Sequence, residues 1–290
     1  MESWIDAVST LRSQRRAAVL LTVTAVRGHA PREAGAKMVI SEDETFGTVG
    51  GGNLEMAAIT RSRQLIGQGS TAPETMELRL NDKAPATYGR QCCGGEIKLL
   101  LEPLPVPETV AIFGLGHVGM ELARILSRHP IDLYLTDSRP EAIEAAALLQ
   151  PSVATIHAQV AVMGEQVLGT LPEGSHVLIM THDHAEDFHL SDAALRYRSL
   201  GSIGLIGSKA KWARFRKNLR DSGHSEQQIS RIQCPIGIPE VAGKQPAVIA
   251  VSVAAQLMQL LGDHAERSAP GNIVELPTTP DRIHPAMNRA

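Results

Sequence analysis

Cys92 and Cys93 are adjacent in a glycine-rich stretch, which makes them the first candidates for chemistry. Adjacent cysteines form only a strained disulfide, and a structural zinc site needs four ligands, usually as spaced cysteine pairs. Thiolate chemistry then remains, and a thiolate suits sulfur transfer or a soft metal centre. Arg90 favours the thiolate if it lies close, while Gly94 and Gly95 let a bulky ligand approach the backbone. The alternative is a pair of small buried side chains.

A second candidate site is the segment VAIFGLGHVG, in which Gly114, Gly116 and Gly119 have G-x-G-x-x-G spacing. The segment follows an expected strand and opens an expected helix, which is the context that a dinucleotide-binding turn requires. Its glycines allow a tight turn, and the helix N-terminus offers amides to a pyrophosphate. Asp137 ends the next expected strand, where it is placed to accept hydrogen bonds from a ribose. The alternative is a Rossmann fold whose nucleotide site is degenerate.

Polar residues also follow a later strand of this half. His182, Asp183 and His184 come directly after it, at the end where ligands bind in open α/β sheets. We expect the two histidines to line a ligand cleft. One alternative is a metal site that also uses Asp187 and His189, and another is a helix cap beside solvated histidines.

Lys209 stands at the following strand-to-helix turn, in the segment GLIGSKAKWARFRK. In this position it can pair with a phosphate of a ligand. The alternative is a basic surface helix, since Lys211, Arg214, Arg216 and Lys217 continue along the same segment.

The N-terminal half carries two more candidates, in APREAGAKM and GTVGGGNLE. The triplet Gly50, Gly51 and Gly52 brings backbone amides close to a ligand, a geometry that binds anions. Glu55 falls early in the following helix, where a carboxylate also stabilises the helix dipole. Arg32 can bind an anion bidentately, or it forms a surface salt bridge.

Composition argues against several protein classes. Of the 290 residues 43% are hydrophobic but only 3% are aromatic, so aliphatic side chains must fill the core. The net charge of −3 and the lack of a long basic run argue against nucleic-acid binding. No apolar run is long enough for a membrane, and the N-terminus lacks the layout of a secretory signal. We therefore expect a cytoplasmic protein whose cysteines are thiols, with Cys234 buried among apolar neighbours.

The elements that must position these residues form two halves. The first half begins with an expected helix over 3–15, capped by Ser3, and ends at three prolines between residues 103 and 107. In the second half strands alternate with helices, which predicts parallel β-α-β units. We expect an α/β protein with an N-terminal α+β domain over 1–104, a Rossmann-like domain with a mainly parallel, doubly wound sheet over 108–262, and a flexible tail over 263–290.

The chain resembles the XdhC/CoxI family, the accessory proteins of xanthine dehydrogenase and related molybdenum hydroxylases. Seven motifs carry the resemblance in this order: GHAPREAGAKM, GTVGGGNLE, QCCGGE, FGLGHVG, THDHAED, IGLIGSKAK and CPIGIP. Because the motifs are ordered and spread over most of the chain, the resemblance is specific.

The resemblance implies binding of the molybdenum cofactor, as molybdopterin or as its dinucleotide form, without turnover of its own. It implies exchange of a molybdenum oxo ligand for a sulfido ligand, with sulfur from a cysteine desulfurase. It also implies delivery to the molybdenum-binding subunit of xanthine dehydrogenase, and a homodimer. Cys92 and Cys93 are the implied contacts to the cofactor and its molybdenum, with Gln91 and Gly94 beside them.

Two other functions remain open on the residues alone. The Rossmann fingerprint by itself also fits an NAD(P)-dependent oxidoreductase, although no acid–base pair names a substrate. The third possibility is an adaptor that holds a desulfurase and a dehydrogenase together, with a vestigial nucleotide site.

Overall fold

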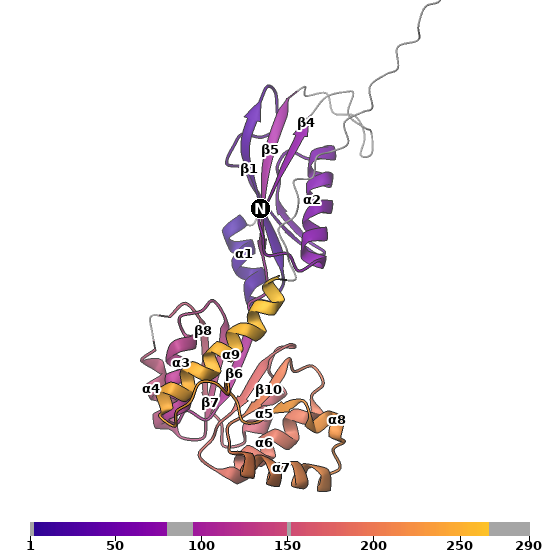
Figure 1. Cartoon of the computed structure of the whole chain (residues 1–290). Helices are drawn as coiled ribbons and strands as arrows, with labels where there is room; N and C mark the ends of the chain where they lie inside the picture. Colours follow the sequence, from indigo (N-terminus) through magenta and orange to yellow (C-terminus); the bar gives the residue numbers. More distant parts are fainter. Residues whose placement is uncertain (1–2, 80–94, 150–151, 267–290) are drawn as a thin grey trace, which may run out of the picture. The chain divides into compact units, whose positions relative to one another are not determined.

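The computed structural model of the chain describes residues 3–79, 95–149 and 152–266 (Figure 1). The described chain divides into two compact units, the first up to Val106 and the second from Pro107 to His264. The first contains an antiparallel sheet and the second a parallel sheet. The predicted α/β class, with a Rossmann-like second half, is therefore confirmed.

The first unit is built on a five-stranded sheet in the order β3-β2-β1-β5-β4. Its strands, all paired antiparallel, are β1 (Ala18–Arg27), β2 (Lys37–Ser41), β3 (Thr45–Gly47), β4 (Glu74–Arg79) and β5 (Glu96–Leu104). Helix α1 (Trp4–Ser13) begins at the predicted cap, because the Ser3 hydroxyl accepts a hydrogen bond from the Ile5 amide. Helix α2 (Gly52–Gly67) follows the glycine triplet.

The two helices cover opposite faces of this sheet, because side chains along β1 alternate between its faces. Val19 and Leu21 pack with Leu54 of α2, whereas Ala18 packs with Leu11 of α1. A bulge at residue 24 interrupts the pairing of β1 with β5. Since a bulged strand bends, β1 turns just before the loop that carries Arg32.

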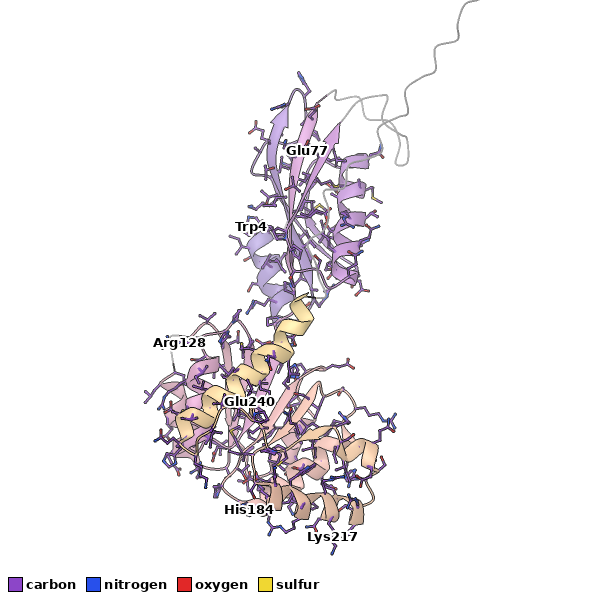
Figure 2. The ribbon with its side chains drawn as sticks, in the orientation of Figure 1. Trp4, Glu77, Arg128, His184, Lys217 and Glu240 are labelled. Atoms are coloured by element: carbon purple, nitrogen blue, oxygen red, sulfur yellow. The ribbon has the colours of Figure 1, made fainter. Side chains whose placement is uncertain are left out.

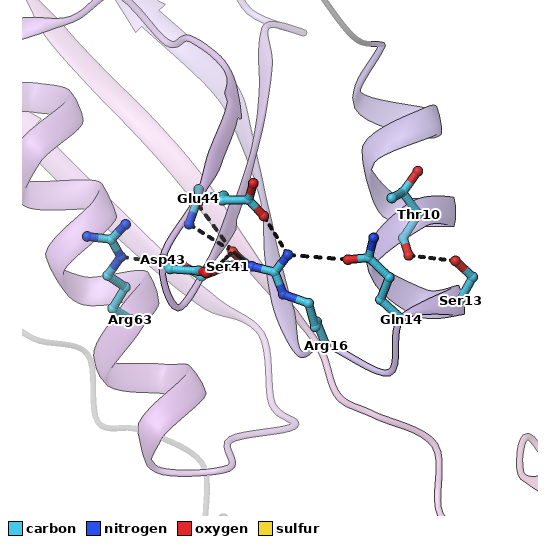
Figure 3. Close-up of polar contacts among 8 residues, drawn as sticks. All are labelled: Thr10, Ser13, Gln14, Arg16, Ser41, Asp43, Glu44 and Arg63. Atoms are coloured by element: carbon cyan, nitrogen blue, oxygen red, sulfur yellow. Dashed lines mark hydrogen bonds and ion pairs between the residues drawn. The ribbon is translucent and has the colours of Figure 1, made fainter. Parts of the chain in front are cut away.

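Arg16 ties the turn after α1 to the β2–β3 hairpin (Figure 3). Its guanidinium donates to the Ser41 hydroxyl at 3.1 Å and forms ion pairs with Asp43 and Glu44. Arg63 of α2 donates to the Ser41 carbonyl at 3.3 Å. The hairpin is thus held from both helices, so these charges serve the frame of the unit.

The second unit contains six parallel strands in the order β11-β10-β9-β6-β7-β8. They are β6 (Thr109–Phe113), β7 (Asp132–Asp137), β8 (Thr155–Val160), β9 (His176–Ile179), β10 (Ser202–Leu205) and β11 (Ile232–Gln233). The strand order reverses between β6 and β9. In open sheets the ligand site lies beyond the carboxyl ends of the strands at such a reversal, and here the turn after β6 holds Gly114.

Helices cover both faces of the second sheet (Figure 1). One face packs against α3 (His117–Leu126), α4 (Pro140–Ala147) and α9 (Pro246–Glu266), and the other against α5 (Gly164–Leu168), α6 (His184–Arg196), α7 (Lys209–Asp221) and α8 (Glu226–Ile229). Ile112 belongs to the first core and Phe113 to the second, as alternation along β6 requires.

Four short elements were not predicted: β3, α5, α8 and β11. Each has five residues or fewer, too few for a hydrophobic period to show. Helix α9 continues to Glu266, beyond the predicted start of the tail, because Gly262 costs a helix only about 1 kcal/mol. Within the described ranges, no helix has the combined length and hydrophobicity needed to cross a membrane.

Candidate functional site

In the first unit the loop that carries Arg32 lies against the glycine triplet. The loop joins β1 to β2, and its Pro31 ring packs on Gly50. A Cβ atom at Gly50 would lie 2.2 Å from the Pro31 Cγ atom, and the φ of Gly50 is +125°. Both facts require glycine there, so two motifs that are separate in sequence meet in one place.

The segment that carries the cysteine pair begins and ends at the same end of this sheet. Glu96 of β5 pairs with Arg27 of β1 on one side and with Arg79 of β4 on the other. A Cβ atom at Gly95 would lie 2.3 Å from the carbonyl oxygen of His29, in the Arg32 loop. Gly95, which follows the segment, therefore lies beside that loop, whereas Arg79, which precedes it, lies two strands across from β1. The predicted contacts Gln91, Cys92, Cys93 and Gly94 lie outside the described residues.

The Arg32 loop forms an open pocket of about 320 Å³. Its lining contains one arginine, one histidine and one acidic residue, and the full set is Val26, Gly28, His29, Ala30, Arg32, Glu33 and Ala34. Arg32, His29 and Glu33 are all exposed. The pocket is thus open to a ligand of moderate size and offers it both signs of charge.

The glycine triplet does not form the anion cradle that its sequence suggests. The Glu55 carboxylate accepts hydrogen bonds from the Thr48 hydroxyl at 2.5 Å, the Val49 amide at 3.2 Å and the Gly51 amide at 3.0 Å. Amides that already donate to a carboxylate are not available to a second anion, which the same carboxylate would also repel. The triplet and Glu55 together shape a turn against Pro31, and the conformation of this turn depends on Glu55.

In the second unit the three glycines of the fingerprint have different surroundings. A Cβ atom at Gly114 would lie 2.4 Å from the Met180 carbonyl oxygen, and one at Gly119 would lie 2.1 Å from the Gly114 carbonyl oxygen. Gly114 and Gly119 therefore allow close packing of β6, β9 and α3. Gly116 faces open space and is the N-cap of α3, with no side chain capping the helix. Gly116 is the position that a ligand can approach.

Asp137 closes onto this turn from the end of β7. One carboxylate oxygen accepts from the Leu115 amide at 2.7 Å and from the Arg139 guanidinium at 2.9 Å, and the other accepts from the amide and guanidinium of Arg139. Burial raises the pKa of Asp137, but these hydrogen bonds outweigh it and hold the pKa below its usual value. With its side chain only 2% exposed, Asp137 holds the turn itself and is not free to accept from a ribose.

A buried ion pair between Asp187 and Lys211 connects the ends of β9 and β10. Their side chains are 1% and 9% exposed. Asp187 also accepts from the amide and hydroxyl of Thr181, at 2.9 and 2.8 Å, and Lys211 donates to the Ile206 carbonyl at 3.0 Å. The alternative interpretation of this segment as a basic surface helix therefore does not hold for Lys211. Its spacing from Phe215 and Leu219, both buried, was the signal that it faces inward.

The remaining predicted residues of the second unit lie at its surface. His182 and His184 are exposed after β9. The His184 ring (Figure 2) is 3.4 Å from the Arg214 guanidinium. Lys209 is exposed at the start of α7. Within the described ranges, no three His, Cys, Asp or Glu side chains cluster as metal ligands do. The metal alternative for the histidines is therefore not supported, and Asp187 is committed to Lys211.

Glu186, in the first turn of α6, was not singled out from sequence. Burial raises its pKa, and the carboxylates of Asp137 and Asp187 add to the effect while His182 opposes it. Glu186 therefore brings negative charge to the side of the site that Asp137 occupies. The sequence holds no clear signal for this, since Glu186 reads as an ordinary residue of a helix N-terminus.

Two family models match the chain. One, described as the XdhC Rossmann domain, matches residues 110–257, and the other, described as the XdhC and CoxI family, matches residues 11–78. The chain belongs to the XdhC family. The resemblance inferred from its motifs is thus confirmed. The matched segments of this XdhC-family chain contain the Arg32 loop, the glycine triplet and the Rossmann turn, and Cys92 and Cys93 fall between them.

Two curated relatives come from Escherichia coli K12. The uncharacterized protein YqeB is 26% identical over 254 residues, which cover 88% of this chain and 44% of YqeB, so the chain spans less than half of that relative's length. The molybdenum cofactor insertion chaperone PaoD is 24% identical over 286 residues, covering 87% of this chain and 85% of PaoD. A crystal structure described as a xanthine dehydrogenase from Bacillus halodurans is 22% identical, covers 93% of this chain and 98% of that one, and has a TM-score of 0.47.

Proposed function

We propose that this XdhC-family protein carries a molybdenum cofactor and inserts it into a molybdenum enzyme of the xanthine dehydrogenase type. The function is taken from the relative PaoD, whose name describes insertion of this cofactor. One observation supports it in this chain. The Arg32 loop, the glycine triplet and Gly95, which lies where the cysteine-bearing segment rejoins the sheet, converge in the first unit.

The side chains of the Arg32 loop and of the cysteine pair suit the proposed cargo, the molybdenum cofactor. A pterin dithiolene with a phosphate needs a cationic contact, and Arg32 offers a planar fork of donors. Cys92 and Cys93 are the proposed soft ligands, because thiolates suit a molybdenum centre. Gly95, which touches the His29 carbonyl, fixes where the cysteine-bearing segment rejoins the sheet.

The second unit has a supporting part in this proposal. Gly116 and the uncapped N-terminus of α3 are the groups of this unit that suit a nucleotide phosphate. The NAD(P)-dependent oxidoreductase alternative gains nothing from this geometry, because both oxygens of Asp137 are used within the turn. A ribose diol would have to displace Arg139 or the Leu115 amide.

The proposal extends to sulfuration and delivery. We propose that a cysteine desulfurase supplies persulfide sulfur and that a cellular thiol reduces it by two electrons to sulfide. This sulfide then replaces a molybdenum oxo ligand, which leaves as water, while the cofactor is held near Cys92 and Cys93. The finished cofactor then passes to the apo-enzyme. The family resemblance supports these steps, and two adjacent thiols suit a ligand exchange at molybdenum.

The proposal is tested by purifying the protein without oxygen from cells that make the cofactor, then measuring molybdenum and released pterin. The changes are Cys92→Ala, Cys93→Ala and both together, and Cys234→Ala is the matched control because that thiol lies in the second unit. We expect retention to fall in the first three variants and to match the unchanged protein in the control. Full retention in the double variant would remove the assigned role of the pair.

A further inference from the structure

We infer that the Arg32 pocket is a phosphate site, and that it takes the phosphate monoester of the cargo. The Arg32 pocket is the open pocket of the β1–β2 loop described above. Arg32 supplies its positive charge, and His29 also lines it. The assignment to a cofactor phosphate rests on the proposed function. The assignment to a phosphate in general rests on the pocket alone.

The glycine triplet, the obvious alternative place for a phosphate, is already occupied by a carboxylate. Glu55 takes the Val49 and Gly51 amides. A phosphate at that turn would meet a fixed negative charge and would have to compete with it for the same donors. The neighbouring loop, which packs on the triplet through Pro31, is where positive charge is available.

Arg32 differs from Arg16 and Arg61 of the first unit in its surroundings. Arg16 is held by Asp43 and Glu44, and Arg61 is held by both carboxylate oxygens of Glu74 at 2.8 and 2.6 Å. Among the described residues no carboxylate pairs with Arg32, which is exposed at the pocket. An exposed guanidinium that no described carboxylate holds can receive two oxygens of a phosphate through parallel N–H donors.

The loop that carries Arg32 is fixed in place from three sides. Pro31 packs on Gly50, the His29 carbonyl packs on Gly95, and the Gly35 amide donates to the Val23 carbonyl at 2.8 Å. A pocket held by backbone contacts is formed before its ligand arrives, so less ordering opposes binding. The contact with Gly95 also sets the pocket beside the point where the cysteine-bearing segment rejoins β5.

Glu33 allows a test in which two neighbouring variants change binding in opposite directions. It is the acidic residue of the pocket lining and opposes an anion. Arg32→Gln should therefore weaken phosphate binding at least about tenfold. Glu33→Gln should strengthen it about two- to fivefold, as expected for one exposed charge. Arg32 and Glu33 are both exposed, so neither variant removes a contact in the hydrophobic core.

The experiment is a titration of the full chain with inorganic phosphate and with glycerol phosphate at low ionic strength, followed by phosphorus NMR. Arg12→Gln is the matched control, because it removes an exposed positive charge from α1 in the same unit. We expect this control to leave both dissociation constants unchanged. Equal weakening by Arg32→Gln and Arg12→Gln would overturn the site, and so would weaker binding in Glu33→Gln or no binding in the unchanged protein.

A second readout separates this inference from the proposed function. Cofactor retention is measured for the Arg32→Gln protein purified as described for the cysteine variants. Reduced retention together with reduced phosphate binding supports a cofactor phosphate in the pocket. Full retention with reduced phosphate binding overturns the cargo assignment, whereas the cysteine variants alone decide whether the protein carries the cofactor.

Discussion

The buried ion pair of Asp187 and Lys211 gives a quantitative test of how the second unit is held. Lys211→Met keeps most of the side-chain stem but removes the ammonium group. Asp187 would then keep its two hydrogen bonds from Thr181 but would be a carboxylate only 1% exposed, with no cation beside it. Its charge would be stranded at the ends of β9 and β10.

The expected cost follows from that stranded charge. Removing one partner of a buried pair typically costs about 3–5 kcal/mol, a large part of the stability of a domain. For a unit of this size, each kcal/mol of lost stability lowers the thermal midpoint of unfolding by about 2–4 °C. We therefore expect Lys211→Met to lower the thermal midpoint of the second unit by about 6–20 °C. Adding Asp187→Asn removes the charge while an amide oxygen can still accept from Thr181. The double variant should therefore lie within about 2 kcal/mol of the unchanged protein.

The chain offers a clean optical assay for this unit. It has two tryptophans, Trp4 in α1 of the first unit (Figure 2) and Trp212 in α7, next to Lys211 in the sequence. In a Trp4→Phe background the fluorescence of Trp212 alone reports unfolding of the second unit in urea. Lys217→Met, which removes an exposed charge from the same helix, is the control and should change stability by no more than about 0.5 kcal/mol.

The reasoning would be refuted by either of two results. One is a Lys211→Met variant whose stability matches that of the Lys217→Met control. The other is a double variant that is as unstable as the sum of the two single losses predicts, since a true ion pair requires coupling between its members.

Three further outcomes are expected. Gly119→Ala should destabilise the second unit by about 1–3 kcal/mol, because its Cβ would lie 2.1 Å from a backbone oxygen. Gly116→Ala should unfold as the unchanged protein does, because Gly116 faces open space. Equal urea midpoints for the two variants would contradict this. Burial raises the pKa of Cys234 to about 11 from 9.0. In a protein whose other two cysteines are changed to serine, iodoacetamide at pH 8 should therefore react with the folded chain about a hundredfold more slowly than with the chain in urea. A ratio of the two rates near one would show that the thiol is accessible. The pKa of Glu186 is raised by burial, so the protonated carboxyl stabilises the fold below its unfolded pKa, and that contribution is lost as pH rises through the folded pKa. Glu186→Gln should therefore raise the thermal midpoint of unfolding at pH 7 but leave it nearly unchanged below about pH 4. A lower midpoint at pH 7 would show that the fold favours the charged form.

The architecture could be predicted because its signals are local. Alternating strands and helices after the proline-rich boundary indicated a parallel sheet, and the G-x-G-x-x-G spacing indicated which strand comes first. Ser3 as the first helix cap could be predicted in the same way, because an N-cap depends on its own helix. Elements of a few residues, such as α8 and β11, could not, since tertiary contacts rather than periodicity stabilise them.

The partners of the charged side chains could not be predicted in this way. The sequence alone allows a common interpretation of each residue: Asp137 as a nucleotide contact, Glu55 as a residue that stabilises a helix dipole, and Lys211 as part of a basic surface helix. In the fold, Asp137 accepts from the Leu115 amide in the turn after β6, and Glu55 accepts from the Gly51 amide of the turn before α2. Lys211 is paired with Asp187. A buried charge must take a partner within hydrogen-bond reach, and which group lies within reach depends on where remote turns meet.

The sequence by itself determined the family, the α/β class and the parallel sheet of the second half, because each of these depends on residue type and spacing along the chain. Only the tertiary structure decided that the Arg32 loop lies against the glycine triplet and beside Gly95, where the cysteine-bearing segment rejoins the sheet. It also decided that Glu55 accepts from the Gly51 amide of the triplet and from the Val49 amide beside it. The physical reason is that hydrogen bonds and packing act over a few ångströms, and proximity on that scale is set by the fold.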